Sequence, residues 1–505
     1  MVFEGDQDLF HRRQRLAGGL TLRKKYTARS MPNAIETAIR SVVTKGIYLL
    51  ADFNRVRLGW DKTPHPYLTG IHRPMADEKT LTELSVTGLI PKSLDGRYLR
   101  IGPNPIKPNA AGHHWFVGDG MVHGIALENG RAIWYRNRWI RSSAVSAAQR
   151  KPPAPGPRHG ANDTVNTNVV GIGGRTWALV EAGAYPVELD QTFESQRYNP
   201  FDDTLAGSFT AHPHQDPKTG EYLAIAYEAT EPNEVRHIVL SAEGRVLRET
   251  PIPVEHGPSI HDCGFTARYV VILDLPVTFS MRSLIGGHRF PYKWNPKHRA
   301  RVGLLPRGGD ASAVIWCDVD PVYAFHVANA FDAPDGTVVL DVVAYESMFN
   351  GNLRGPSGKG ALERWTIDPV AKSVKRKVID AQPQEFPRAD ERRLGQPYRY
   401  LYASASASAD EVPAGSKLVK HDMEGATRQV HDFGPDRYPG EFVFVPAPAG
   451  SAEDEGWLMG FVVDSEHETT DLVILDARDF EGEPVAAVHL PHRVPPGFHG
   501  NWVPN

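Results

Sequence analysis

The chain has 505 residues, of which 41% are apolar and 23% charged, with 46 glycines and 41 prolines. This composition is typical of a globular, turn-rich protein and excludes a fibrous or disordered chain. A formal net charge of -4 gives no electrostatic reason to bind nucleic acid, so that class of partner is excluded. Two cysteines, acidic residues near the start and the lack of an apolar run of about 18 residues predict a cytoplasmic protein without a spanning helix.

Residues 1–65 differ from the rest of the chain, and we expect them to form a basic N-terminal helical extension. Residues 1–60 carry 11 lysines and arginines against five acidic residues. Apolar residues recur there at helical spacing, which predicts one amphipathic helix. They are Ile35, Ala38, Ile39, Val42, Val43 and Ile47. Two interpretations are open: the helix packs on the main body, or it lies in the membrane interface and gives peripheral membrane contact.

From about residue 80 onward, short β-rich runs alternate with tight-turn signals. The runs include TWALVEA, EYLAIAY, YVVILDLPV, TVVLDVVAY, WLMGFVVD and DLVILDA. The turn signals include Glu128-Asn129-Gly130, Thr219-Gly220, Ala242-Glu243-Gly244, Asp335-Gly336 and Glu424-Gly425. Runs of this length between such turns predict strands joined by hairpins, and crossover helices are scarce, so the sheets are expected to be antiparallel.

The predicted fold class is all-β. About 420 residues of strands without a change in composition fit a closed, radially repeated architecture, because closure protects sheet edges that an open sheet of this size would expose. We therefore expect residues 66–505 to form a single β-propeller. No clear sequence repeat marks each blade, so the pattern does not give the number of blades.

Four of the 21 histidines stand beside unusual local sequence. They are His212, His261, His326 and His499, separated by 49, 65 and 173 residues. Such gaps argue against a local metal motif. In a propeller, however, the innermost strands of several blades face one axis, so distant residues can meet there. Imidazole nitrogens suit iron, copper and zinc. If the four histidines meet at the axis of a propeller, they would form a metal site of four neutral imidazoles.

A site built only from neutral ligands calls for carboxylates around it. A ligating histidine usually donates its other ring N–H to a carboxylate, which fixes the tautomer and the ring orientation. The candidates are Glu181, Glu385 and Glu441, each in or beside a strand-like apolar run. From the sequence pattern alone, each is explained equally well as a surface acid.

Taken together, the segments around these residues resemble the carotenoid cleavage oxygenase family from about residue 66 to the C-terminus. The matching segments, in order, are GRY (96–98), RIGPNP (100–105), HHWFVGDGMVHGI (113–125), NTNVV (166–170), TAHPHQDP (210–217), HDCGFTARYVVILDLPVTF (261–279), FHVANAFD (325–332), EFPR (385–388) and GFHGNW (497–502). The stretch after DLPVTF is shorter than is common in the family, and a shorter cap would alter the tunnel or the membrane-facing patch.

The resemblance implies a seven-bladed propeller with a helical and loop cap over one face and an Fe(2+) cofactor on the axis. It implies that the four histidines are the metal ligands, with His212 preferred to its neighbour His214 because the family's ligand follows a Thr-Ala pair. It also implies that the three glutamates orient the ligands. Phe325 and Thr167 match residues that line the substrate and dioxygen cavity. No residue is assigned as a general acid or base.

The implied activity is dioxygen-dependent cleavage of a conjugated C=C bond in a carotenoid or apocarotenoid, which gives two carbonyl products. The partners are then an apolar polyene and dioxygen. One alternative is a stilbene- or phenylpropanoid-cleaving dioxygenase with the same iron site. Another, from a different class, is a non-catalytic propeller that serves as a binding module. Metal analysis would separate the last from the other two.

Overall fold

The computed structural model describes residues 46–58, 64–111, 113–160, 162–351, 360–406, 415–448 and 452–505. The chain divides into two compact units, residues 1–49 and 50–505. Most of the predicted N-terminal amphipathic helix, up to residue 45, lies outside the described residues. Helical structure is described at residues 46–55, and Ile47 is partly buried there.

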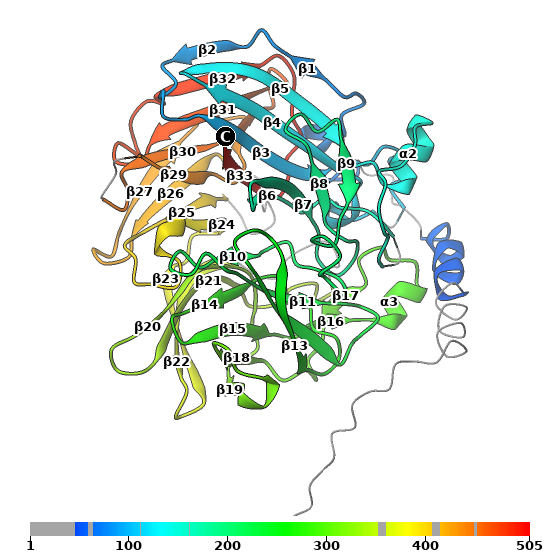
Figure 1. Ribbon diagram of the computed structural model, residues 1–505, viewed down its shortest axis with the longest axis vertical. Helices are drawn as coiled ribbons and strands as arrows, with labels where there is room; N and C mark the ends of the chain where they lie inside the picture. Colours follow the sequence, from blue (N-terminus) through cyan, green and yellow to red (C-terminus); the bar gives the residue numbers. More distant parts are fainter. Residues whose placement is uncertain are drawn as a thin grey trace, which may run out of the picture. The chain divides into compact units, whose positions relative to one another are not determined.

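The unit formed by residues 50–505 is built of sheets arranged around a centre (Figure 1), and their strand pairs are antiparallel except for the parallel pair of β19 and β23. The first sheet has the order β1 (Thr80–Leu81), β5 (Arg131–Trp139), β4 (Gly120–Glu128), β3 (Gly96–Pro103) and β33 (Gly500–Pro504). The second has the order β6 (Asn168–Ile172), β7 (Arg175–Leu179), β8 (Val187–Leu189) and β9 (Gln196–Tyr198). The third has the order β10 (His214–Gln215), β11 (Tyr222–Tyr227), β12 (Glu234–Leu240) and β13 (Val246–Pro253).

The middle of the chain forms an eight-stranded sheet in the order β14 (Cys263–Phe265), β15 (Tyr269–Asp274), β18 (Arg301–Pro306), β19 (Ile315–Asp318), β23 (Ser373–Asp380), β22 (Gly360–Asp368), β21 (Val338–Tyr345) and β20 (Tyr323–Asp332). A two-stranded sheet joins β16 (Val277–Phe279) and β17 (Tyr292–Trp294). A four-stranded sheet follows: β24 (Gln384–Ala389), β25 (Tyr400–Ala405), β26 (Lys417–Asp422) and β27 (Thr427–Asp432).

The last sheet has the order β2 (Ser85–Gly88), β32 (Ala486–Leu490), β31 (Thr469–Asp476), β30 (Gly456–Asp464) and β28 (Arg437–Pro439), with β29 (Val443–Pro446) also paired to β30. Helices are few in the described ranges. They include α2 (Ser143–Gln149), α3 (Met281–Ile285) and the short 3-10 turns η1 (Gly70–His72), η2 (Trp115–Val117), η3 (Ala311–Ala313) and η4 (Glu391–Arg393). The stretch after DLPVTF forms α3 and β17.

The predicted strands and hairpins are confirmed. All six β-rich runs contain strands, and each of the five turn signals joins two strands that pair with each other. In the first of these turns Asn129 and Gly130 both have positive φ, 52° and 77°. This is the backbone that a two-residue hairpin favours, and Asn and Gly adopt it at the least steric cost.

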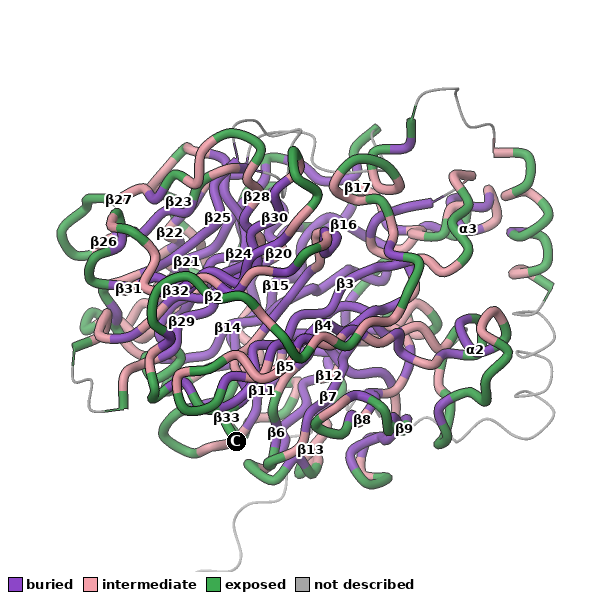
Figure 2. Tube along the Cα trace, turned by 90° about the horizontal axis from the view of Figure 1, so that it is seen from above, coloured by how far each residue is buried: buried purple, intermediate pink, exposed green. Residues whose placement is uncertain are grey.

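The first and last parts of the chain share two sheets, which closes the ring. The C-terminal strand β33 pairs with β3, and β2 pairs with β32. Buried residues fill the interior of this unit and exposed residues lie at its rim (Figure 2). The fold is therefore an all-β propeller, as the sequence predicted.

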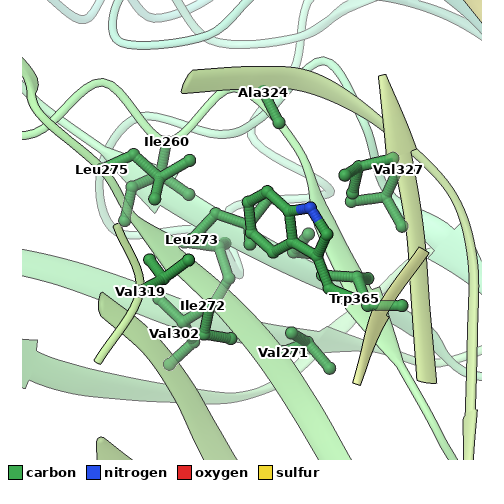
Figure 3. Close-up of a cluster of buried hydrophobic side chains, with 14 of the residues drawn as sticks. Ile260, Val271, Ile272, Leu273, Leu275, Val302, Val319, Ala324, Val327 and Trp365 are labelled. Atoms are coloured by element: carbon green, nitrogen blue, oxygen red, sulfur yellow. The ribbon is translucent and has the colours of Figure 1, made fainter. Parts of the chain in front are cut away.

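The largest apolar cluster includes residues of the third sheet and of both halves of the eight-stranded sheet. In the largest cluster, Trp365 of β22 packs among Leu273 of β15, Val302 of β18 and Val327 of β20 (Figure 3). Strands that are buried on both faces read as nearly continuous apolar runs, which is the pattern of β21. Packing of this kind holds the innermost strands at fixed positions around the centre.

Candidate metal centre

The four candidate histidines lie at sheet edges that face the centre of the ring. His212, His261 and His499 each lie one or two residues before an edge strand, β10, β14 and β33 respectively, and His326 lies in the edge strand β20. The pairing of β20 with β21 shifts in register between Ala324 and Val327. A bulge of this kind re-aims side chains, and it occurs here at His326.

All four imidazoles are buried and meet in one cluster, which we call the tetrad. One ring nitrogen from each lies within 4.8 Å of those of the others. The Nε2 atom of His261 lies 2.9 Å from that of His212 and 3.2 Å from that of His326. The Nε2 atom of His326 lies 3.3 Å from that of His499. His214 belongs to a different cluster.

Three carboxylates fix the outer nitrogens of the tetrad. The Nδ1 atom of His261 lies 2.9 Å from Glu181, that of His326 lies 2.5 Å from Glu385 and that of His499 lies 3.1 Å from Glu441. A carboxylate at Nδ1 accepts that proton, so the lone pair of a neutral ring is left on Nε2. Three such lone pairs therefore point at one common centre.

This arrangement fits a bound cation. Two nitrogens that ligate one ion at about 2.1 Å and at right angles lie about 3.0 Å apart, close to the spacings of the tetrad. Burial, and then the adjacent imidazoles, lowers the pKa of His212 well below its usual value. Burial also lowers the pKa of His499 to about 4, although Glu441 opposes the shift. Both rings are thus neutral near pH 7, as a metal ligand must be.

The three carboxylates have different surroundings. Burial opposes ionisation of Glu441, but Arg388 and His499 lower the pKa of Glu441 to about 2. Arg388 Nε donates to Glu441 across 3.0 Å, and the backbone N–H of Gly500 donates to its other oxygen across 2.8 Å. Each carboxylate that stays ionised compensates part of the charge of a cation held by neutral ligands.

Glu385 receives two donors besides the imidazole. The Tyr345 hydroxyl and the Phe386 N–H each donate to it across 2.7 Å. Glu181 differs, because its second oxygen is buried and has no hydrogen-bond partner. The tetrad therefore has two fully bonded carboxylates and one that keeps a free acceptor.

An aromatic cluster lies next to the tetrad. Phe325 is 5.3 Å from the His261 ring between centroids, and Phe116 is 5.8 Å from Phe325 and 5.7 Å from Phe498. Phe290 and Phe349 complete this cluster at 5.0 Å from each other. Its surface offers contacts to an apolar ligand rather than hydrogen bonds.

Another side of the tetrad has a mixed polar and apolar lining, in which Phe386 lies 5.5 Å from His326 and 5.4 Å from His499 between ring centroids. A cavity of about 50 Å³ is lined by three tetrad rings and by charged residues that include Asp262, Arg388 and Glu391. Thr167 is buried. Its backbone carbonyl accepts a hydrogen bond from the backbone N–H of His499 across 3.2 Å, and its hydroxyl donates to the side chain of Asn166. It therefore lies beside the tetrad through its backbone.

Sequence reasoning did not identify Arg388, Tyr345, Asp262 or most of the aromatic cluster. Arg388 lies in the EFPR segment, but its partner Glu441 is 53 residues away. Tyr345 and Glu385 are 40 residues apart. The only signal in the sequence was that these residues lie in or near the segments that resemble the family. That signal does not show which groups each side chain contacts.

The fold and the tetrad together describe a propeller with a histidine cluster at its centre, and comparisons with known proteins identify the family. Residues 72–504 match the sequence model of the retinal pigment epithelial membrane protein family. A carotenoid cleavage oxygenase of Mycobacterium tuberculosis is 41% identical over 494 residues, which is 88% of this chain and 98% of that protein. The chain therefore belongs to the carotenoid cleavage oxygenase family and is an enzyme of the oxygenase class.

Solved structures show the same fold. The apocarotenoid oxygenase of Synechocystis is similar with a TM-score of 0.77 and 27% identity, covering 86% of this chain and 97% of that one. It has also been solved in a cobalt-substituted form. A lignostilbene dioxygenase of Pseudomonas brassicacearum is similar with a TM-score of 0.79 and 27% identity, covering 88% of this chain and 100% of that one.

Among the described residues, no helix combines the length and the apolar character needed to cross a membrane.

Proposed function

We propose that this protein is a non-haem Fe(2+) dioxygenase that cleaves one conjugated C=C bond of a carotenoid or apocarotenoid. Dioxygen supplies one oxygen atom to each carbon of that bond, so the products are two aldehydes or ketones. The observation that carries the proposal is the convergence of the tetrad's Nε2 atoms, three of them with carboxylates at the opposite nitrogen.

The tetrad would hold the iron as four neutral ligands. Iron bound there would supply redox chemistry toward dioxygen, for which imidazole ligands with open positions are suited. Glu181, Glu385 and Glu441 would hold the protons on Nδ1 and balance the charge of the ion. Burial of the tetrad keeps bulk water away from the reacting groups.

The aromatic cluster would bind and orient the polyene. A conjugated chain has no groups that require hydrogen bonds, so stacked and edge-on rings suit it. Phe325 lies between the tetrad and the rest of the cluster, which supports a role beside the reacting bond. Thr167 would shape the dioxygen and substrate site next to His499, whose backbone N–H donates to the Thr167 carbonyl. The position of the polyene along the aromatic cluster would then decide which of its double bonds is cleaved.

Cleavage of a stilbene is the second candidate. The free acceptor of Glu181 and a buried hydroxyl pair, Tyr227 with Ser259 at 3.0 Å, are groups that could hold a phenol. The likeness to the lignostilbene dioxygenase supports the same reading. The larger share of apolar aromatic surface beside the tetrad favours the polyene.

The test is to load the protein with Fe(2+) and incubate it separately with β-carotene, an apocarotenal and resveratrol. We expect aldehyde products from a carotenoid or the apocarotenal and none from resveratrol, identified by mass spectrometry. Aldehydes from resveratrol alone would contradict the proposed substrate. Purified protein that takes up no stoichiometric iron would contradict the metal centre itself.

We further infer that residues 66–505 form one oxygenase domain of seven blades with a cap over one face, and that residues 1–65 are an extension of it. The family match over residues 72–504 supports the domain boundary. The blade count is supported by the eight-stranded sheet, whose halves join at the single pair Asp318 and Ser373. Two four-stranded blades explain such a weak junction better than one continuous sheet.

Peripheral membrane contact is also proposed for this protein. On the helix at residues 46–55 and just after it, Leu50, Phe53 and Val56 are exposed. Asn54 Nδ2 and Arg55 Nε donate to the carbonyls of Ile285 and Gly287 at the end of α3. These bonds hold the apolar side chains outward, which is the arrangement that an interfacial helix requires.

A further inference from the structure

The buried carboxylate of Asp262, the residue after His261, ties together backbone segments around the tetrad. Its Oδ1 atom accepts a hydrogen bond from His214 Nε2 across 2.6 Å and from the Cys263 N–H across 2.7 Å. Its Oδ2 atom accepts from the Val327 N–H across 2.8 Å. The side chain is 2% exposed, so these bonds form away from water.

Each partner of Asp262 is next to a different histidine of the tetrad. His214 lies two residues after His212, and Val327 directly follows His326. His214 belongs to β10 and Val327 to β20, whereas Asp262 directly precedes β14. One carboxylate thus joins the three chain segments that present His212, His261 and His326.

This role differs from that of the three glutamates. Glu181, Glu385 and Glu441 bond directly to imidazole rings and so set the orientation of each ring. Asp262 bonds instead to two backbone N–H groups and to His214. β20 is an edge strand of its sheet, so Asp262 gives the Val327 N–H a partner that no further strand supplies.

We propose that Asp262 is a positioning residue that sets the spacing of three of the four metal-binding segments before the metal binds. The inference rests on the proposed metal centre and deepens it. A ligand set that is already spaced for the ion does not have to be ordered on binding, and its affinity is higher for that reason. Loss of Asp262 should therefore weaken metal binding although no ligand is removed.

The structure offers a matched control in Asp274. This aspartate is also fully buried, accepts from His298 Nε2 across 2.8 Å and from Arg301 Nε across 2.8 Å. Like Asp262 it is a buried aspartate that accepts from a histidine, but neither of its partners lies within two residues of a tetrad histidine. Substitution of Asp274 should lower stability without changing the metal centre.

The experiment compares full-length wild-type protein with Asp262→Asn, Asp262→Glu, His214→Phe and Asp274→Asn. Metal-free protein is titrated with Co(2+), and the dissociation constant, the visible spectrum of the bound ion and the thermal midpoint of the metal-free protein are measured. Asp262→Glu keeps the charge but misplaces the carboxylate, so it separates position from electrostatics. His214→Phe leaves Asp262 intact and removes one of its donors.

We expect Asp262→Asn and Asp262→Glu to weaken Co(2+) binding by about 10-fold or more and to alter the spectrum, as substitutions around metal ligands do. His214→Phe should weaken binding less, and Asp274→Asn should lower only the thermal midpoint. An unchanged dissociation constant in Asp262→Asn, or in His214→Phe if the Asp262 variants do not fold, would overturn the inference.

Two other outcomes would also overturn it. If Asp262→Glu binds Co(2+) as tightly as the wild type, the weaker binding of Asp262→Asn is due to the lost charge and not to altered spacing of the segments. Equal weakening in Asp274→Asn would assign it to general stability. Wild-type protein that binds neither Co(2+) nor Fe(2+) would refute the metal centre first and the inference with it, so failure of the proposed function is recognised before the variants are compared.

Discussion

At the scale of single residues, the backbone brings the carboxylates to the tetrad in an unusual conformation. Phe386 and Ala182, the residues that follow Glu385 and Glu181, have positive φ values of 56° and 54°. This region disfavours side chains other than those of Gly, Asn and Asp, so the surrounding structure must hold it in place. At Phe386 the conformation coincides with an N–H bond to the preceding carboxylate.

The hydrogen bonds of Glu385 lead to a prediction about metal affinity. Glu385→Gln should weaken Fe(2+) or Co(2+) binding by roughly 10-fold to 100-fold, because an amide holds the His326 N–H less strongly than a carboxylate and carries no charge. The dissociation constant of the metal is the quantity to measure. Glu363→Gln is a suitable control, because Glu363 is also buried but bonds to Arg376 and Trp365. An affinity equal to that of the wild type would contradict the orienting role.

At the scale of elements, the tetrad depends on edge strands. β10, β14, β20 and β33 each lie at the end of a sheet, and each carries a histidine of the tetrad or directly follows the segment that does. A strand at an edge has one side free of ladder bonds, so its backbone N–H groups can serve the site, as that of Val327 does. The broad apolar packing between the sheets keeps these edges in register.

The helix at residues 46–55 gives the prediction at this scale. Full-length protein should float with anionic liposomes, and the double variant Leu50→Ser/Phe53→Ser should float several-fold less, because both side chains are exposed and apolar. Val370→Ser is the matched control, since Val370 is 91% exposed in the turn between β22 and β23. Equal flotation of the wild type and the double variant would exclude this helix as the contact.

At the scale of the whole molecule, closure of the ring completes the site. β33 pairs with β3 from Gly96 to Arg100, which places His499 opposite residues that precede it by about 400 positions. Gly500 lies at this junction, and a Cβ atom there would come 2.6 Å from the Leu99 carbonyl oxygen. The pairing of β3 with β33 therefore places the fourth histidine at the tetrad.

Burial of histidines throughout the ring predicts how stability depends on pH. Burial lowers the pKa of His237 and of His421 to about 4. Between that value and the ordinary value near 6.5, the unfolded chain binds protons that the folded chain does not. Stability should therefore fall as the pH drops from about 6.5 to 4, by up to about 1.4 kcal/mol per pH unit for each group.

Urea unfolding of the metal-free protein at pH 7 and pH 5 measures this effect. We expect a lower midpoint at pH 5, and a smaller difference between the two pH values in His421→Gln, which has one fewer titrating group. A midpoint that stays the same at both pH values would contradict the prediction.

The sequence by itself determined the strands, their turns and the all-β class. Alternating and continuous apolar runs encode local burial, and pairs such as Asn129-Gly130 encode a turn within a few residues. The four histidines and three glutamates were candidates from their local sequence, but their roles were implied only by the family's motifs, because gaps of 49, 65 and 173 residues carry no local signal.

Only the tertiary structure decided the contacts around the tetrad. The bonds from Arg388 to Glu441, from Tyr345 to Glu385 and from Val327 to Asp262 join residues 53, 40 and 65 positions apart. Such contacts depend on the register between sheets and on closure of the ring, and neither is written in the periodicity of a single strand. Local burial can be read from neighbouring residues, whereas convergence on an axis is a property of the packed whole.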